Sequence, residues 1–130
     1  MEKPTLLYLF IIASGLFLIP VSLSFSQQAN DILGKWQDVD HAEKQIEITK
    51  HKDFFIGKAI NDSGKNSKNG TIVFHELIWD NRDKSYSGTL INPDNNDKFE
   101  IKIRMEEKDS FRFTVGKFIF SKAFLFKRIP

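Results

Sequence analysis

The sequence predicts an all-β domain in which about eight short antiparallel strands close into an up-and-down barrel. Apolar and polar residues alternate in several runs, most clearly over residues 99–105 (FEIKIRM), as in strands with one buried face. Turn residues separate these runs at regular spacing, and no amphipathic helix pattern follows residue 26. Closing such a meander into a barrel removes its exposed edges. An open sandwich of similar size is the structural alternative.

Residues 1–26 are predicted to be a signal peptide and not part of the fold. After a basic start, residues 6–19 are almost entirely apolar. Ser24 and Ser26 place small residues at the two positions that a signal peptidase reads, so the expected cut precedes Gln27. The apolar run of about 14 residues is shorter than the roughly 20 of a membrane-spanning helix. An uncleaved anchor is the alternative.

The composition of the chain indicates one small domain that is stabilised by packing alone. Residues 27–130 suffice for one domain with one core. The net charge is +2 and the charges are interspersed, which indicates a solvated surface and not a nucleic-acid footprint. Cysteine is absent, whereas ten of the 13 phenylalanines follow the leader. We therefore expect a monomer without disulfides, with no nucleic-acid partner and no membrane span after cleavage.

The pattern places the strands as follows. We expect them at residues 32–38, 45–50, 54–60, 71–79, 85–91, 99–105, 111–115 and 118–128. Between them lie turn signals, the strongest at residues 92–97, where Pro93 fixes φ and the Asn and Asp side chains bond their own backbone. Residues 106–109 are a further predicted turn. Residues 61–70 are expected to be an exposed connection and the most mobile part of the mature chain.

Three of these strands depart from a simple alternation of apolar and polar residues. For residues 54–60 two choices remain open, with Phe54, Ile56 and Ile60 inward or with Phe55, Gly57 and Ala59 inward. Residues 71–79 are apolar on both faces. Residues 85–91 carry Gly88 at their middle, where a barrel strand often bends or bulges.

Short motifs along the chain carry a resemblance to a bacterial family. They are DILGKW at residues 31–36, IEI at 46–48, FIGK at 55–58, YSGTLINPD at 86–94 and FLFKRI at 124–129. Together they resemble bacterial domain-of-unknown-function family 2147, whose members are small exported lipocalin-like β-barrels. The resemblance implies an exported bacterial protein that works in the periplasm or outside the cell. The family has no established activity to transfer.

The opening Gly34-x-Trp36 also resembles the first strand of the lipocalins and their fatty-acid-binding relatives. In those proteins an arginine of the last strand stacks on a tryptophan at the closed end of the barrel, and the matching residues here are Arg128 and Trp36. Gly34 would let the backbone bend close beneath the indole. A guanidinium over an indole contributes about 0.5–2 kcal/mol and would tie the first strand to the last. The alternative is that Trp36 is only a large core residue and Arg128 a solvated terminus.

No pattern in the chain indicates catalytic, metal or cofactor chemistry. His41, His51 and His75 have no partner at metal-ligand spacing. Residues 92–97 superficially resemble a calcium loop but lack its glycine and its bidentate glutamate. No serine lies in a nucleophile elbow, and the carboxylates of residues 106–107 fall in a predicted exposed turn. We therefore expect no catalytic residues, no metal and no cofactor.

The apolar interior remains as the candidate site. An eight-stranded barrel is either filled by its side chains or wide enough for one small ligand, and the sequence leaves both open. A cavity would be lined by Phe99, Ile101, Ile103, Phe111 and Phe113, and its ligand would be lipid-like or aromatic. The expected function is non-catalytic binding of a small hydrophobic molecule. The alternative is an envelope-structural or protein-interaction module with a packed core, and an enzyme is a weaker third.

Overall fold

A computed structural model describes residues 27–61, 67–115 and 122–130. The predicted signal peptide, residues 62–66 of the predicted long connection and residues 116–121 lie outside the described residues. The elements are the 3₁₀ helix η2 (Ala29–Ile32) and the strands β1 (Gly34–Asp38), β2 (Gln45–His51), β3 (Phe54–Ile60), β4 (Ile72–Asp80), β5 (Ser85–Ile91), β6 (Lys98–Glu107), β7 (Ser110–Val115) and β8 (Lys122–Arg128). No helix within the described residues is long and apolar enough to cross a membrane.

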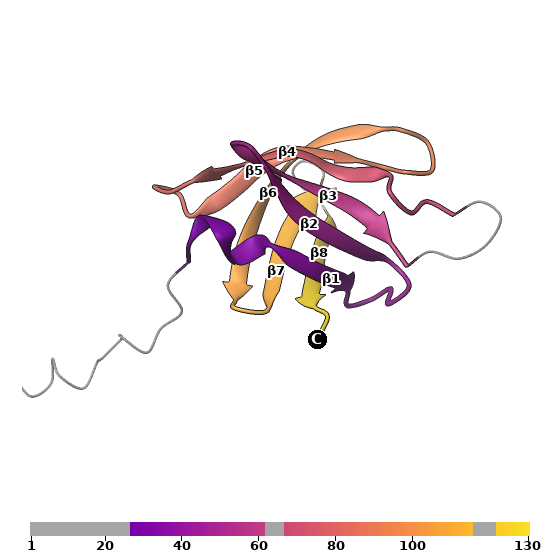
Figure 1. Cartoon of the computed structure of the whole chain (residues 1–130), viewed down its shortest axis with the longest axis horizontal. Helices are drawn as coiled ribbons and strands as arrows, with labels where there is room; N and C mark the ends of the chain where they lie inside the picture. Colours follow the sequence, from indigo (N-terminus) through magenta and orange to yellow (C-terminus); the bar gives the residue numbers. More distant parts are fainter. Residues whose placement is uncertain (1–26, 62–66, 116–121) are drawn as a thin grey trace, which may run out of the picture.

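The eight strands form a closed antiparallel barrel in which each strand pairs with the next (Figure 1). The barrel closes where β8 returns to β1, with Trp36 opposite Arg128 and Asp38 opposite Phe126. The predicted up-and-down barrel is therefore confirmed, and the open sandwich is excluded. Closure pairs the strand edges that a meander would otherwise leave exposed.

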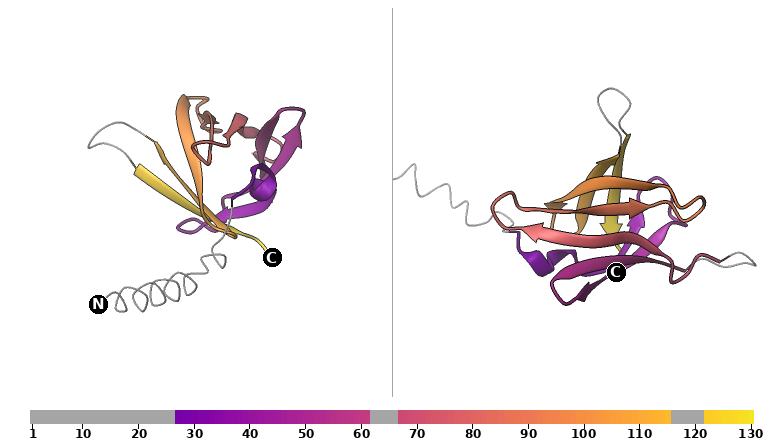
Figure 2. Two further views of the ribbon diagram at one scale, coloured as in Figure 1. Left: turned by 90° about the vertical axis from the view of Figure 1, so that its left-hand side faces the viewer. Right: turned by 90° about the horizontal axis from the view of Figure 1, so that it is seen from above.

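The antiparallel order gives the barrel two unlike ends. One end carries η2, the hairpins β2–β3, β4–β5 and β6–β7, and the C-terminal end of β8; we call it the capped end. The other end lies at the opposite ends of the strands, and we call it the open end. In the left view of Figure 2 the strands converge near the C-terminus and diverge away from it.

The first strand is shorter than predicted because its expected start belongs to η2. Ile32 is the last residue of that helix, and β1 begins at Gly34. The carbonyl of Ile32 accepts a hydrogen bond of 2.9 Å from the Trp36 indole Nε1. The helix thus turns the chain over the capped end and satisfies the one polar group of the buried tryptophan.

The structure settles which face of β3 is inward. Phe55 and Gly57 are buried, whereas Lys58 is exposed, so the second of the two choices is correct. Gly57 is required by packing, since a Cβ there would lie 2.8 Å from the Phe74 ring on β4. A larger residue would displace an aromatic side chain from the centre of the barrel.

A β-bulge explains why β4 is apolar on both faces. The register between β4 and β5 shifts between His75 and Ile78, and Glu76 adopts a left-handed φ of 49°. The extra residue lets Leu77 point inward like Phe74. Gly88 lies opposite, where a Cβ would be 2.8 Å from the Glu76 carbonyl oxygen. The irregularity that Gly88 indicated is therefore in the neighbouring strand, while β5 keeps an unbroken register with β6.

The predicted turn at residues 106–109 is partly wrong. β6 continues through Glu107, so Glu106 lies on the outer face of a strand and not in a turn. Arg112 on β7 donates to it at 2.7 Å. This hydrogen bond holds the pKa of Glu106 below its ordinary value. The interaction across the two strands favours continued pairing where the sequence indicated only charged residues.

Candidate functional site

The exposure of inward-facing side chains changes along the length of the barrel. On β6, Ile103 is fully buried and Ile101 is 5% exposed, whereas Phe99 is 40% exposed. The same trend holds on β7, where Phe111 is fully buried and Val115 is half-buried. The barrel interior is therefore packed toward the capped end and accessible to solvent toward the open end.

Aromatic rings fill the capped half of the interior. Phe111 makes an edge-on contact with Trp36, with ring centroids 4.8 Å apart, and stacks on Phe126 at 5.1 Å. Phe74 packs edge-on against Phe113 at 5.4 Å. Such ring pairs contribute about 0.5–1.5 kcal/mol each beyond the area that they bury. This half is a core, and a ligand would have to displace it to enter.

The open half presents apolar side chains that are only partly covered. Leu90 and Phe99 are paired across β5 and β6, and Val115 and Phe124 lie on the inner face of β7 and β8. Phe124 stacks on Phe113 at 5.1 Å, so Phe113 separates the two halves. We call Leu90, Phe99, Val115 and Phe124 the mouth. Among the described residues, these inward-facing apolar side chains keep part of their surface exposed to solvent.

All five predicted lining residues lie on the inner face of β6 and β7, but their side chains differ in exposure. Phe99 belongs to the mouth, while Ile103 and Phe111 are enclosed by neighbouring side chains. Leu90, Val115 and Phe124 were missed. The alternation of β5, β7 and β8 already carries the signal for them, because each is two residues from an inward-facing position.

The capped end is closed by the guanidinium of Arg128. Its carbon lies 4.2 Å from the centroid of the Trp36 ring. Nη1 donates to the Leu33 carbonyl at 2.7 Å and Nη2 to the Asp31 carbonyl at 2.8 Å. A Cβ on Gly34, whose φ is +128°, would lie 2.7 Å from Nη1. Arg128 is therefore not a solvated terminal residue; it joins β8 to η2 and β1.

Tyr86 is a further capping residue, which the sequence analysis did not identify. Its hydroxyl donates toward the carbonyls of Ala29 at 2.7 Å and Gln28 at 3.1 Å, and its ring packs edge-on against Phe55. Burial, together with the negative charge of Asp31, raises the pKa of Tyr86 well above its ordinary value. The hydroxyl therefore keeps its proton and holds η2 over the barrel.

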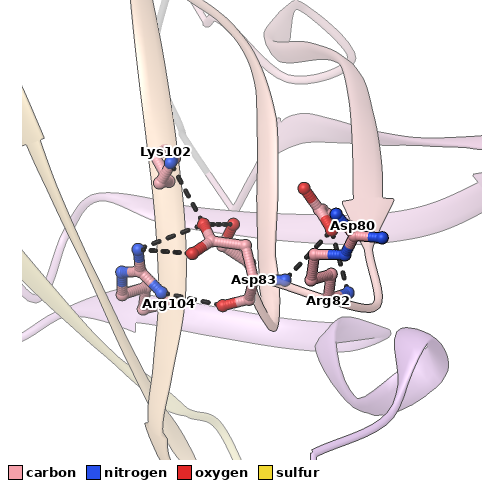
Figure 3. A network of polar contacts seen from close by, with 6 residues as sticks. Asp80, Arg82, Asp83, Lys102 and Arg104 are labelled. Carbon is pink, nitrogen blue, oxygen red and sulfur yellow. Dashed lines mark hydrogen bonds and ion pairs between the residues drawn. The ribbon is translucent and has the colours of Figure 1, made fainter.

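A polar network on the outer face of the capped end involves the β4–β5 hairpin and β6 (Figure 3). Asp83 accepts hydrogen bonds from Ser85 at 2.6 Å and Arg104 at 3.1 Å, and pairs with Lys102 at 3.1 Å. These three partners hold the pKa of Asp83 well below its ordinary value. The charges of Asp83, Lys102 and Arg104 are thus paired with one another on an exposed surface. This arrangement is better suited to holding the β4–β5 hairpin against β6 than to catalysis.

The outer face of the barrel carries polar side chains as well. In the part of the chain that is described, no group of three or more His, Asp or Glu side chains could hold a metal ion. The outer face of β4–β6 carries a shallow open hollow around Ile78, with Glu76, Ser87 and Thr89 at its sides. Its lining combines polar side chains with the apolar side chains of Ile78 and Ile101.

The fold has a counterpart among solved structures, although sequence comparison finds none. No family model matches this chain, and no curated protein sequence matches it significantly. Its structure is similar to HP1028 from Helicobacter pylori, described as belonging to the lipocalin family, with a TM-score of 0.62. The fold is lipocalin-like. The identity is 18% over 76% of this chain and 83% of HP1028, so the likeness carries the architecture alone, and membership in family 2147 stays a prediction.

Proposed function

We propose that this protein is an exported, non-catalytic binder of a small hydrophobic molecule, which it holds in the mouth. The observation that carries the proposal is the contrast on β6 between Phe99, 40% exposed, and Ile103, fully buried, on the same face. Solvent-exposed apolar surface on the inside of a barrel is unfavourable in water, and covering it with an apolar ligand removes that cost.

The packed half limits the size of the ligand. Phe113 and the rings beneath it occupy the interior toward the capped end, so a bound molecule cannot extend along the whole barrel axis. It would lie against Phe99 and Phe124 and leave part of its surface in solvent. Because the rings leave only the open half of the interior, a short alkyl chain or a single aromatic ring system fits better than a long or fused molecule.

Export is the second part of the proposal, and it is supported by the leader alone. Residues 1–26 have the apolar run and the small residues of a cleavable signal. A cysteine-free domain folds equally well in an oxidising compartment. We place the mature protein in the periplasm or outside the cell.

The alternative function is an envelope-structural or protein-interaction module. One observation favours it: Ile78 is 56% exposed on the outer face of β4, beside the shallow hollow. An exposed apolar side chain on a strand can contact a partner protein. The two functions use opposite faces of the barrel wall. One variant on each face can therefore separate them.

The test is a titration of the chain of residues 27–130 with a naphthalene dye whose emission rises in apolar surroundings. We expect saturable binding at one site. Phe99→Asp should weaken it at least tenfold, because it places a charge in the mouth. Ile78→Asp is the matched control, since it adds the same charge to an exposed apolar position on the outer face and should leave the affinity unchanged. Circular dichroism would check that both variants fold.

Two results would contradict the proposal. One is the absence of saturable dye binding to the unmodified chain. The other is a loss of binding in Ile78→Asp with none in Phe99→Asp, which would place the apolar site on the outer face and support the interaction module.

A further inference from the structure

The rim of the mouth carries a positive charge on the inner side of β8. Phe126 and Phe124 point inward, and Lys122 continues the same alternation, opposite Val115 of β7. The Lys122 Nζ lies over the Phe124 ring, 5.0 Å from its centroid. A cation above a ring face is attracted by it but keeps its charge. The ammonium is thus held at the edge of the apolar surface that we propose binds the ligand.

This charge has no carboxylate partner within the part of the chain that the structure describes. Lys102, by contrast, pairs with Asp83 at 3.1 Å. Asp38, on the neighbouring strand β1, is buried opposite Phe126. Its Oδ1 accepts the backbone N–H of Asp40 at 2.8 Å, so this carboxylate is engaged in a turn. The rim therefore presents an exposed cation beside apolar side chains.

We propose that the molecule bound in the mouth is an anionic amphiphile, whose apolar chain lies against Phe99 and Phe124 and whose acidic headgroup contacts Lys122. The inference rests on the proposed function, because it assumes that the mouth is the binding site. The depth of the mouth agrees with this orientation. The interior below Phe113 is filled by rings, so a charged headgroup stays at the rim, where water also solvates it, and the chain end points inward.

The experiment compares three ligands with the same ten-carbon chain: decanoate, decanol and decylammonium. Each displaces the naphthalene dye from residues 27–130 in 0.1 M salt at pH 7.5. Decanoate should bind most tightly and decylammonium most weakly. Lys122→Gln should weaken decanoate about fivefold, the size expected of an exposed ion pair, and leave decanol unchanged. Lys127→Gln is the matched control, because it removes the same charge from the outer face of the same strand and should affect none of the ligands.

The outcomes distinguish the two proposals. If decanol binds but decanoate binds no more tightly, or if Lys122→Gln leaves decanoate unchanged, the anionic headgroup is excluded and the hydrophobic site stands. Equal losses in Lys122→Gln and Lys127→Gln would show a general effect of protein charge and would also overturn the inference. If the dye binds saturably but none of the three ligands displaces it, the inference fails alone; if the dye itself does not bind saturably, the proposed function fails as well.

Discussion

The two ends of this barrel are built from the same eight strands but differ in how their inward-facing side chains are packed. At the capped end Trp36, Tyr86 and Arg128 are each held by at least one hydrogen bond to the chain near η2, and aromatic rings fill the space between the strands. At the open end the inward-facing residues Leu90 and Phe99 retain exposed surface. One packed end can thus hold the barrel closed, and the inner surface of the other end stays partly exposed to solvent.

The largest difference between the ends should be in stability. Trp36→Ala removes a fully buried side chain and should lower the free energy of unfolding by about 3–5 kcal/mol. Phe99→Ala removes a ring of similar character that is 40% exposed and should cost about 1 kcal/mol. Urea unfolding monitored by far-UV circular dichroism measures both. Equal losses would show that the open end contributes to the core as much as the capped end does.

The next largest loss of stability is expected where the last strand joins the first. Arg128→Met keeps an apolar stem over Trp36 but leaves the carbonyls of Leu33 and Asp31 without their guanidinium donor. We expect a loss of about 2 kcal/mol. Lys127→Met, on the outer face of the same strand, should change the stability by less than about 0.5 kcal/mol. Similar losses of stability in the two variants would mean that the guanidinium of Arg128 does not stabilise the junction of β8 with η2 and β1.

The smallest predicted stability effect depends on pH. Tyr86→Phe loses the hydrogen bonds to Ala29 and Gln28 and should cost about 1 kcal/mol at pH 7. The pKa of Tyr86 is raised in the folded protein, so its contribution is complete below the ordinary tyrosine pKa of about 10 and is lost as the pH rises above it. The difference between the two proteins should therefore hold up to about pH 9 and narrow between about pH 10 and pH 11 in parallel urea titrations. A constant difference over this range would contradict the role of the hydroxyl.

The sequence predicts the parts of this fold that depend on local patterns. Alternation over residues 99–105 and the turn at 92–97 locate β5 and β6, and in that turn Asn92 accepts the backbone N–H of Asp94 as expected. The resemblance of Gly34-x-Trp36 to lipocalins pointed to Arg128. The contacts of Arg128 with backbone carbonyls could not be predicted, because they depend on where η2 crosses the capped end.

Other features depend on register and were beyond local reasoning. The bulge at Glu76 is specified by its fit against Gly88 on the neighbouring strand, and neither residue alone indicates which strand is irregular. The split of the interior into packed and accessible halves is similar. Ile103 and Phe99 occupy equivalent positions in the alternation, and only the assembled barrel shows that rings enclose one and not the other.

The most direct test of the contrast between the capped and open ends is a titration of isotope-labelled residues 27–130 with decanol. The NMR signals of the methyl groups and of the Trp36 indole are recorded at each decanol concentration. We predict saturable shifts of the Leu90 and Val115 methyl groups, while the Trp36 indole signal stays in place. No saturable shift, or shifts centred on the Ile78 methyl groups, would contradict the view that the open end of this barrel is its binding end.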